Sequence, residues 1–292
     1  MAKNIKLNNH NFSIICSDPG GSSIILKYLN ENKLKPKSLF LTNTSKKIFK
    51  KKYYKFQTNN KKYFLNSASV FITGTSWKSN LEKKFIAKNK NKDIKIISFL
   101  DSWFNYKKRF EIDGGFIFPH EIWTFDKYAY AIAKNKFPNV KIRRKFLRNK
   151  PKKVKKKKNN NLLYITEPIS EVAHKMYKNK NYFKFNEKKA LDVFLKKSKD
   201  IFGKFNHIFI RIHPNEKKEK YFKIINKYKN LPIKLSNKSL SYDLSNCSKV
   251  IGVASNVLFL ALNNGNQIFS TVSKKNIKLR LPFKKIKHLN LI

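Results

Sequence analysis

The segment Arg211–Glu216, with the sequence RIHPNE, carries residue types that bind anions. It overlaps the end of the apolar run 207–212, which predicts a strand, so His213 stands where this strand ends. Because proline fixes the backbone, Pro214 would hold the histidine in a defined turn. A histidine in that place can donate a hydrogen bond to a phosphate oxygen or stabilise the charge of a leaving group, with Arg211 beside it. The alternative is a structural histidine without a ligand.

A second anion-binding pattern lies further along the chain, at Gly252–Asn256. These residues join the apolar run 249–253 to a helical pattern. Ser255 and Asn256 would therefore lie at the N-terminus of a helix, where backbone N–H groups without partners favour phosphate. Together with the histidine turn, this segment predicts a phosphate site in the second half of the chain.

In the first half, Ser17–Ser23 (SDPGGSS) separates a predicted strand over 12–16 from a predicted helix over 22–30. Glycines let a backbone approach a ligand, and a helix N-terminus presents N–H groups to an anion or to sugar hydroxyls. The segment matches neither the GxGxxG fingerprint nor a Walker loop, so it predicts no dinucleotide or ATP site. A tight turn with a serine N-cap is the alternative. The candidate substrate-binding residues here are Asp18, Gly20, Gly21 and Ser22.

Two further segments of the first half follow predicted strands. Thr73–Trp77 combines small residues with a tryptophan whose face could stack on a sugar, and the alternative is a tryptophan that only packs. Asp101 directly follows the apolar run 94–100, where it can act as a general base towards an acceptor hydroxyl. The alternative is an aspartate that caps a turn or pairs with Arg109. The substrate-binding candidates from these two segments are Thr75, Trp77 and Asn105.

Apolar runs alternate with helical patterns along both halves of the chain. Continuous apolar strands separated by amphipathic helices indicate parallel sheets that are covered on both faces. The sequence therefore predicts an α/β protein with two Rossmann-like parallel-sheet domains facing a cleft, at residues 1–148 and 162–292, joined by the Lys- and Asn-rich linker 149–161. The predicted strands are 12–16, 38–42, 68–74, 94–100, 121–125, 161–166, 207–212, 232–235, 249–253 and 266–270, and the predicted helices are 22–30, 79–89, 127–134, 187–202, 217–228, a short one near 241, and 256–263.

The charge of +49 invites a nucleic-acid interpretation, because lysine and arginine gain affinity by neutralising phosphates. However, only six of the 66 basic residues are arginine, the residue that base and phosphate recognition favours, and the lysines are spread over nearly every segment. We therefore expect no specific nucleic-acid partner. Cys16 and Cys247 read as buried thiols, not as a disulfide or metal site. No secretion signal or membrane span is evident, which predicts a cytoplasmic protein.

The sequence IFIRIHPNE (208–216), followed by VIGVASNVLFLALNNG (250–265), resembles the carboxyl-terminal half of GT-B-fold glycosyltransferases. It is most similar to bacterial sialyltransferases and polysialyltransferases, which have a His-Pro motif and a later Ser motif. A similar His-Pro strand end occurs in the UDP-N-acetylglucosamine 2-epimerase group. The resemblance implies that His213 and Ser255 bind the nucleotide phosphates. The first half looks like surface-polysaccharide proteins of the same fold.

The predicted function is a metal-independent transfer of a sugar, with a sialic-acid-like sugar as one candidate, from a CMP- or UDP-linked donor to a surface glycan hydroxyl. Glu167, which ends the run 161–166, could reach the ribose, and Asp101 would deprotonate the acceptor. No cofactor is expected, and no Asp-x-Asp pair stands at a strand end to bridge a metal ion to a diphosphate. The charge also suits the anionic inner face of a membrane. The alternatives are a hydrolysing nucleotide-sugar 2-epimerase and a non-catalytic basic nucleic-acid-binding protein.

Overall fold

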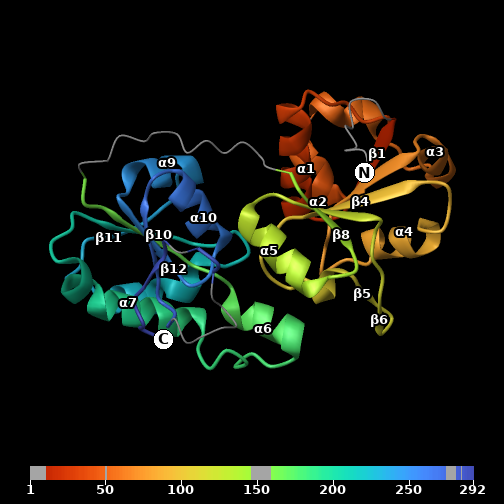
Figure 1. The fold of residues 1–292 in the computed structure, drawn as a ribbon. Helices are drawn as coiled ribbons and strands as arrows, with labels where there is room; N and C mark the ends of the chain where they lie inside the picture. Colours follow the sequence, from red (N-terminus) through yellow and green to blue (C-terminus); the bar gives the residue numbers. More distant parts are fainter. Residues whose placement is uncertain (1–10, 50, 146–158, 274–280, 284) are drawn as a thin grey trace. The chain divides into compact units, whose positions relative to one another are not determined.

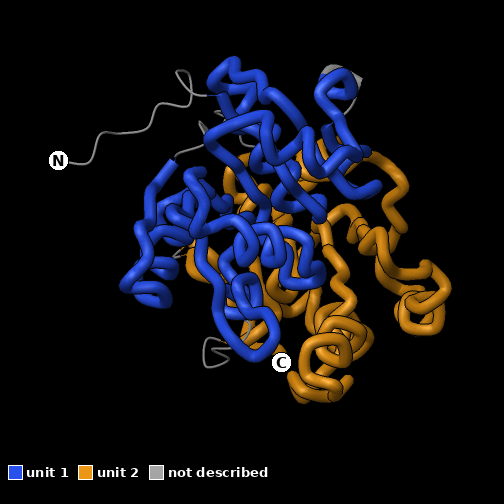
Figure 2. The backbone as a smooth tube through the Cα atoms, turned by 90° about the vertical axis from the view of Figure 1, so that its right-hand side faces the viewer, with its two compact units in different colours: residues 1–148 blue, residues 149–292 orange. Residues whose placement is uncertain are grey.

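The apolar runs of the sequence form the strands of two parallel sheets, one in each half of the chain (Figure 1). The computed structural model describes residues 11–49, 51–145, 159–273, 281–283 and 285–292. The chain divides into two compact units, unit 1 at residues 1–148 and unit 2 at 149–292 (Figure 2). Most of the predicted linker 149–161 lies outside the described residues, so the linker stays a prediction.

The sheet of unit 1 has six parallel strands in the order β2-β1-β3-β4-β7-β8. The chain runs from β1 outward to β2 and then returns to the other side of β1, so the loops after β1 and β3 leave the sheet in opposite directions. A short antiparallel pair, β5 and β6, stands apart from this sheet. The strands are β1 Phe12–Cys16, β2 Leu39–Leu41, β3 Val70–Thr73, β4 Lys95–Leu100, β5 Glu111–Ile112, β6 Gly115–Phe116, β7 Glu121–Thr124 and β8 Lys141–Arg144.

Helices cover both faces of this sheet because successive side chains of a strand point to opposite faces. In β1, Ile14 packs in one core layer with Ile25 and Leu29 of α1. The next residue, Ile15, packs in the opposite layer with side chains of α3 and α4. The helices are α1 Pro19–Glu31, α2 Asn43–Phe49, α3 Lys61–Asn66, α4 Leu81–Asn89 and α5 Lys127–Lys136, with 3-10 turns η2 Lys51–Phe56 and η3 Lys107–Arg109.

Unit 2 repeats this architecture with six parallel strands in the order β11-β10-β9-β12-β13-β14. Tyr164 of β9 stacks on Phe194 of α7 at 4.8 Å between ring centroids, in the core beneath that helix. The strands are β9 Leu162–Ile165, β10 Ile208–Arg211, β11 Ile233–Leu235, β12 Lys249–Gly252, β13 Gln267–Ser270 and β14 Lys287–His288; the helices are α6 Ile169–Tyr177, α7 Glu187–Phe202, η4 Lys218–Tyr221, α8 Phe222–Lys227, α9 Leu240–Asn246 and α10 Asn256–Asn263.

The predicted fold class, α/β with two Rossmann-like parallel sheets, is confirmed. Every predicted strand is present, and α7 has its predicted bounds. The sequence prediction missed the strands β5, β6, β8 and β14 and the helices α2, α3 and α6. Both cysteines are buried and unbridged, as predicted. Within the described ranges, no helix is long and apolar enough to cross a membrane.

A buried carboxylate ties three strands of unit 1 together at the end opposite the candidate residues. Glu121, the first residue of β7, is 1% exposed and lies 3.0 Å from Lys95 of β4 and 2.9 Å from Arg143 of β8. It also accepts a hydrogen bond from Trp123 Nε1 at 3.0 Å. Burial opposes the charge of Glu121, but the hydrogen bonds from Trp123, Lys95 and Arg143 lower its pKa to about 2. The carboxylate therefore stabilises unit 1 as an ion.

We expect Glu121→Gln to lower the free energy of unfolding of unit 1 by about 3 kcal/mol at pH 7, since it leaves the partly buried Lys95 and Arg143 without their counter-ion. All three tryptophans, Trp77, Trp103 and Trp123, lie in unit 1, so urea unfolding followed by tryptophan fluorescence measures this unit. The contribution of Glu121 should persist down to pH 4.5 and fade as the pH falls towards 2. Asp93→Asn, at an exposed position of unit 1, is the matched control. Equal urea midpoints for Glu121→Gln and for the control variant would contradict the stabilising role of Glu121.

Candidate functional site

The strand order of unit 2 brings the two predicted phosphate-binding segments to one place. The chain leaves β9 on one side and returns as β12 on the other, and ligands of open parallel sheets bind at such a switch point. The loops after these two strands meet there, because Glu167 Oε1 accepts the N–H groups of Val253 and Ala254, each at 2.9 Å. Glu167 and the start of α10 are therefore neighbours, as a shared nucleotide site requires.

Glu167 is a half-buried carboxyl group held by backbone donors. Burial raises its pKa to about 7, although the N–H groups of Ala254, Val253 and Ser255 oppose the shift. No ion pair with Glu167 is recorded among the described residues. The group can therefore gain or lose a proton near neutral pH. Because its carboxylate already occupies two amides of the loop, a phosphate bound nearby would have to use other donors around the first turn of α10.

Ser255 is the N-cap of α10, since its Oγ accepts the N–H of Val257 at 3.2 Å. Asn256 follows as the exposed first residue of the helix. This cap role is the structural alternative for Ser255, and it places the hydroxyl at the helix N-terminus that the phosphate prediction requires.

The turn after β10 fixes the orientation of His213. Its backbone N–H donates to Thr166 Oγ1 at 2.9 Å, and its carbonyl accepts the N–H of Glu216 at 2.8 Å. The ring Nδ1 accepts the N–H of Asn215 at 3.2 Å, so the neutral imidazole carries its proton on Nε2. Pro214 is exposed at the tip of this turn. The Nε2–H group of His213 thus lies at the end of β10. The neighbouring strand, β9, leads into Glu167.

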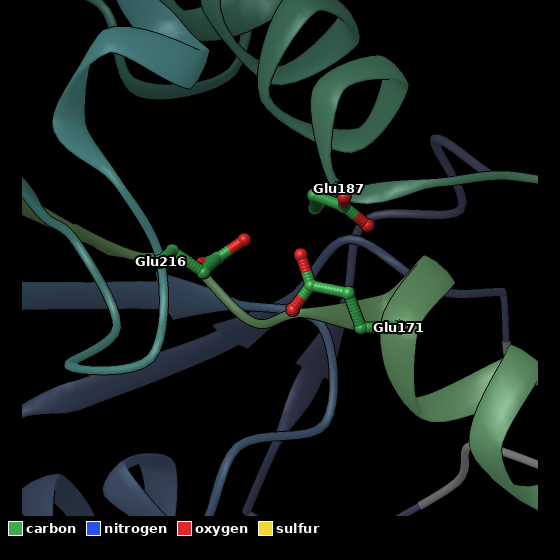
Figure 3. A group of neighbouring side chains, drawn as sticks. All are labelled: Glu171, Glu187 and Glu216. Carbon is green, nitrogen blue, oxygen red and sulfur yellow. The ribbon is translucent and has the colours of Figure 1, made fainter.

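Three glutamates, Glu171, Glu187 and Glu216, lie together (Figure 3), and with Lys220 they form a cluster that supports this turn. The oxygens of Glu171, Glu187 and Glu216 lie within 4.8 Å of one another, a geometry that could hold a metal ion. Lys220 Nζ instead supplies the positive charge, at 3.3 Å, 2.5 Å and 2.8 Å from the three carboxylates. Burial opposes the charge of Lys220, but hydrogen bonds to Glu187 and Glu216 raise its pKa overall. The cluster is a partly buried ion network centred on an ammonium group, with Glu187 buried and Glu171 exposed.

The network reaches His213 through a single side chain. Glu216 Oε2 accepts the hydroxyl of Thr166 at 2.7 Å, and the same hydroxyl oxygen accepts the His213 N–H. Glu216 Oε1 also accepts the hydroxyl of Tyr221 at 2.8 Å. The position of the histidine turn therefore depends on charges that lie on α6, α7 and η4.

Arg211 uses one of its nitrogens inside unit 2. Its Nη1 donates to Asp243 Oδ2 and to the carbonyl oxygen of Lys238, both at 2.7 Å, which links β10 to α9. A phosphate contact from Arg211 would therefore need Nε or Nη2. Its predicted role at the phosphate remains a prediction.

In unit 1, three predicted segments meet at the corresponding switch point between β1 and β3. Asp18 is the N-cap of α1, and its Oδ1 accepts the N–H of Gly21 at 3.0 Å. A Cβ atom at Gly20 would lie 1.9 Å from Asp101 Oδ2, and one at Gly21 would lie 3.1 Å from the Cα of Gly74. A side chain at position 20 would displace the carboxylate of Asp101, because the first turn of α1 lies against the acid that follows β4.

Asp101 forms an ion pair with Arg109, whose Nη1 also contacts the carbonyl oxygen of Thr75. Arg109 Nε donates to the carbonyl oxygen of Phe104 at 3.1 Å. Burial raises the pKa of Asp101, Arg109 opposes the shift, and the charge of Asp18 adds to it. The carboxylate is thus oriented through Oδ1, while Oδ2 lies beside Gly20. This is the pairing that the structural alternative expected, and the general-base role stays a prediction.

The other candidates of unit 1 lie in different surroundings. Ser22 and Thr75 are buried; their hydroxyls donate to Cys16 Sγ at 3.3 Å and to the carbonyl oxygen of Phe99 at 2.9 Å, so they hold the loops in place instead of facing a substrate. Trp77 is half-buried, with Lys78 Nζ 5.1 Å from its ring centre. Asn105 has a φ of 58° in the turn that precedes Arg109.

The sequence analysis overlooked Glu82, which lies in the first turn of α4 and is 2% exposed. Its Oε1 accepts both the N–H and the hydroxyl of Ser17 at 2.7 Å. Burial raises its pKa to about 7, against the effect of those hydrogen bonds. A carboxyl group in a chain with 17 acids, shortly after a candidate loop, was the available signal.

Comparisons with known proteins identify the fold. No family model and no curated protein match the chain. Among solved structures, the UDP-GlcNAc 2-epimerase of Methanocaldococcus jannaschii is similar over 97% of this chain and 89% of its own, with 13% identity and a TM-score of 0.58. MnaA of S. aureus, solved with UDP, covers 91% and 80%, with 10% identity and a TM-score of 0.58. MurG of Acinetobacter baumannii covers 95% and 85%, with 9% identity and a TM-score of 0.51. The chain has a GT-B-type fold.

We expect Glu82→Gln to change how the stability of unit 1 depends on pH. A folded-state pKa of about 7 lies above the unfolded value near 4.5, so the wild type loses up to about 3 kcal/mol as the pH rises from 4.5 to 7. Glutamine does not titrate, so the free energy of unfolding of the variant should rise relative to that of the wild type across this interval. Above pH 7 the difference between the two should stay constant. Urea midpoints from tryptophan fluorescence at pH 5, 6, 7 and 8 measure the difference, with Asp93→Asn, an exposed acid of unit 1, as control. Parallel curves for variant and wild type would contradict the assignment.

Proposed function

We propose that this chain is a metal-independent glycosyltransferase that moves a sugar from a nucleotide donor to a hydroxyl group of a glycan. The observation that carries the proposal is the fixed turn of His213, which places its Nε2–H at the end of β10 beside the switch point of unit 2. A GT-B-type fold agrees with a nucleotide-sugar site in this chain, since a similar structure, the UDP-GlcNAc 2-epimerase of Methanocaldococcus jannaschii, was solved in complex with UDP-GlcNAc and UDP.

On the donor side, unit 2 offers chemically distinct contacts for the parts of a nucleotide. His213 would donate from Nε2 to a phosphate oxygen, and the first turn of α10 at Ser255 would add its N–H groups and dipole. Glu167 would accept hydrogen bonds from the hydroxyl groups of the ribose. A hydroxyl group suits this carboxylate better than a phosphate does, because carboxylate and phosphate are both negatively charged. The proposed donor is linked to CMP or UDP, and a sialic-acid-like sugar is one candidate for the transferred group.

On the acceptor side, we assign Asp101 of unit 1 as the base. The acceptor hydroxyl oxygen would form the new bond to the anomeric carbon while its proton passes to Asp101. The bond from that carbon to the phosphate oxygen breaks, and its electron pair leaves with the nucleotide, where His213 stabilises the charge. Arg109 would keep the carboxylate oriented, and the residues from Asp18 to Gly21 would contact the acceptor.

A cytoplasmic reaction is part of the same proposal. The excess of lysine would favour an anionic donor and contact with the anionic inner face of a membrane.

We expect transfer activity to survive EDTA. The three carboxylates of the acidic cluster in unit 2 already surround the ammonium of Lys220, which takes the place of a metal ion. Product formation from a radiolabelled donor, with and without EDTA, measures this. Complete loss of transfer activity in EDTA, restored by Mg²⁺ or Mn²⁺, would contradict a metal-independent reaction.

We expect His213→Ala to reduce transfer by about 100-fold, since removing one donor to a developing negative charge typically costs that much. A thermal-shift screen of the wild type against CMP, CDP, UDP and GDP should first identify a stabilising nucleotide. The same nucleotide should then stabilise the variant less. His174→Ala, at an exposed position of α6, is the matched control. Wild-type transfer by His213→Ala with an unchanged melting temperature would refute the assigned role.

The epimerase alternative predicts a different product. An epimerase would convert the nucleotide sugar without any acceptor, whereas a transferase would leave the sugar configuration of the donor unchanged. NMR of an acceptor-free incubation distinguishes the two reactions.

A further inference from the structure

Unit 1 contains an apolar pocket that the proposed function does not use. It lies between the sheet and the helices α3 and α4 and has a volume of about 240 Å³. Buried Ile15, Phe64 and Phe85 line it, together with the partly exposed side chains of Phe40, Leu65 and Leu81. Apolar cavities of about 150 Å³ already accept a ring such as benzene, so this pocket has room for a stretch of hydrocarbon.

The rim of the pocket is basic. Lys61 of α3 and Lys84 and Lys88 of α4 line it, and all three are exposed. Lys84 and Lys88 are four residues apart, so they lie on the same side of α4. No acidic residue lines the pocket, and the ion pairs recorded for the described residues include none of these lysines. A negatively charged group at the mouth would therefore meet three positive charges.

One polar side chain completes the lining. Asn89, at the end of α4, is 4% exposed, and its Nδ2 donates to the carbonyl oxygen of Phe85 at 2.9 Å. Its Oδ1 is buried and has no hydrogen-bond partner within the described structure. A buried acceptor without a partner costs about 1–3 kcal/mol, so a ligand hydroxyl that reached it would recover stability.

From these three features, we propose that the pocket binds a single-chain amphiphile that carries a phosphate head group and a hydroxyl group. The hydrocarbon chain would enter between Phe40, Phe64 and Phe85, the phosphate would lie among the three lysines, and the hydroxyl would donate to Asn89 Oδ1. Burial of each methylene contributes about 0.8 kcal/mol, and the lysines select the sign of the head group. This inference is independent of the proposed glycosyl transfer.

The test is isothermal titration of the intact chain with short-chain lysophospholipids below their critical micelle concentration. Lauroyl lysophosphatidic acid should bind with one site per chain, about tenfold or more tighter than lauroyl lysophosphatidylcholine, which has the same chain and no net charge. Absence of binding, or equal affinity for the two lipids, would overturn the proposal.

Three variants separate the pocket from general attraction to a basic protein. Leu65→Trp fills the pocket and should abolish binding, while a wild-type melting temperature shows that the fold is intact. Reversal of Lys61, Lys84 and Lys88 to Glu should weaken binding about tenfold or more, whereas the matched reversal of Lys188, Lys189 and Lys196 on α7 should leave it unchanged. Equal weakening by both triple variants would overturn the proposal.

Asn89 has its own test. Dodecyl phosphate lacks the hydroxyl, so the wild type should prefer the lysophosphatidic acid by several-fold, and Asn89→Leu should remove that preference while both lipids still bind. A preference that persists in Asn89→Leu would show that the hydroxyl does not contact this residue, and would overturn that part of the assignment.

Discussion

Every strand of both six-stranded sheets runs in the same direction as its neighbours, and this constraint gathers the loops of each unit at one edge. The chain then crosses back over its first strand, which separates the loops of β1 and β3 in unit 1 and those of β9 and β12 in unit 2. The loops that carry the candidate residues lie at these two switch points or next to them, because side chains from distant segments can approach there without displacing a strand.

A carboxyl group bridges the separation in each unit. In unit 1, Glu82 follows β3 and holds the backbone of Ser17 after β1; in unit 2, Glu167 follows β9 and holds the backbone of Val253 after β12. Both groups are held by N–H or O–H donors, and both have a pKa of about 7 because burial disfavours their charge. The two units therefore use the same kind of contact, a buried or half-buried carboxyl group on backbone N–H donors, to hold together the loops that follow their strands.

The sequence predicts the strands well because continuous apolar runs are buried on both faces of a parallel sheet. It fails for β8, whose residues KIRR form a polar edge strand, and for α3, where KKYFLN is too short to show a helical period. The positions of Asp101 and His213 directly after strands followed from the apolar runs, whereas the approach of Asp101 to Gly20 is visible only in the fold. Lys220 could not be predicted, because its three carboxylate partners come from separate segments and only the fold brings them together.

The contact between Gly20 and Asp101 has a mechanical consequence. A Cβ atom at Gly20 would lie 1.9 Å from Asp101 Oδ2, so the first turn of α1 and the residue after β4 constrain each other's positions. A side chain at position 20 would push the acid away from its place beside Arg109, whereas other positions of the segment Ser17–Ser23 do not meet this carboxylate. Under the proposed function, acceptor specificity and proton transfer would then diverge in evolution at separate positions of these two segments.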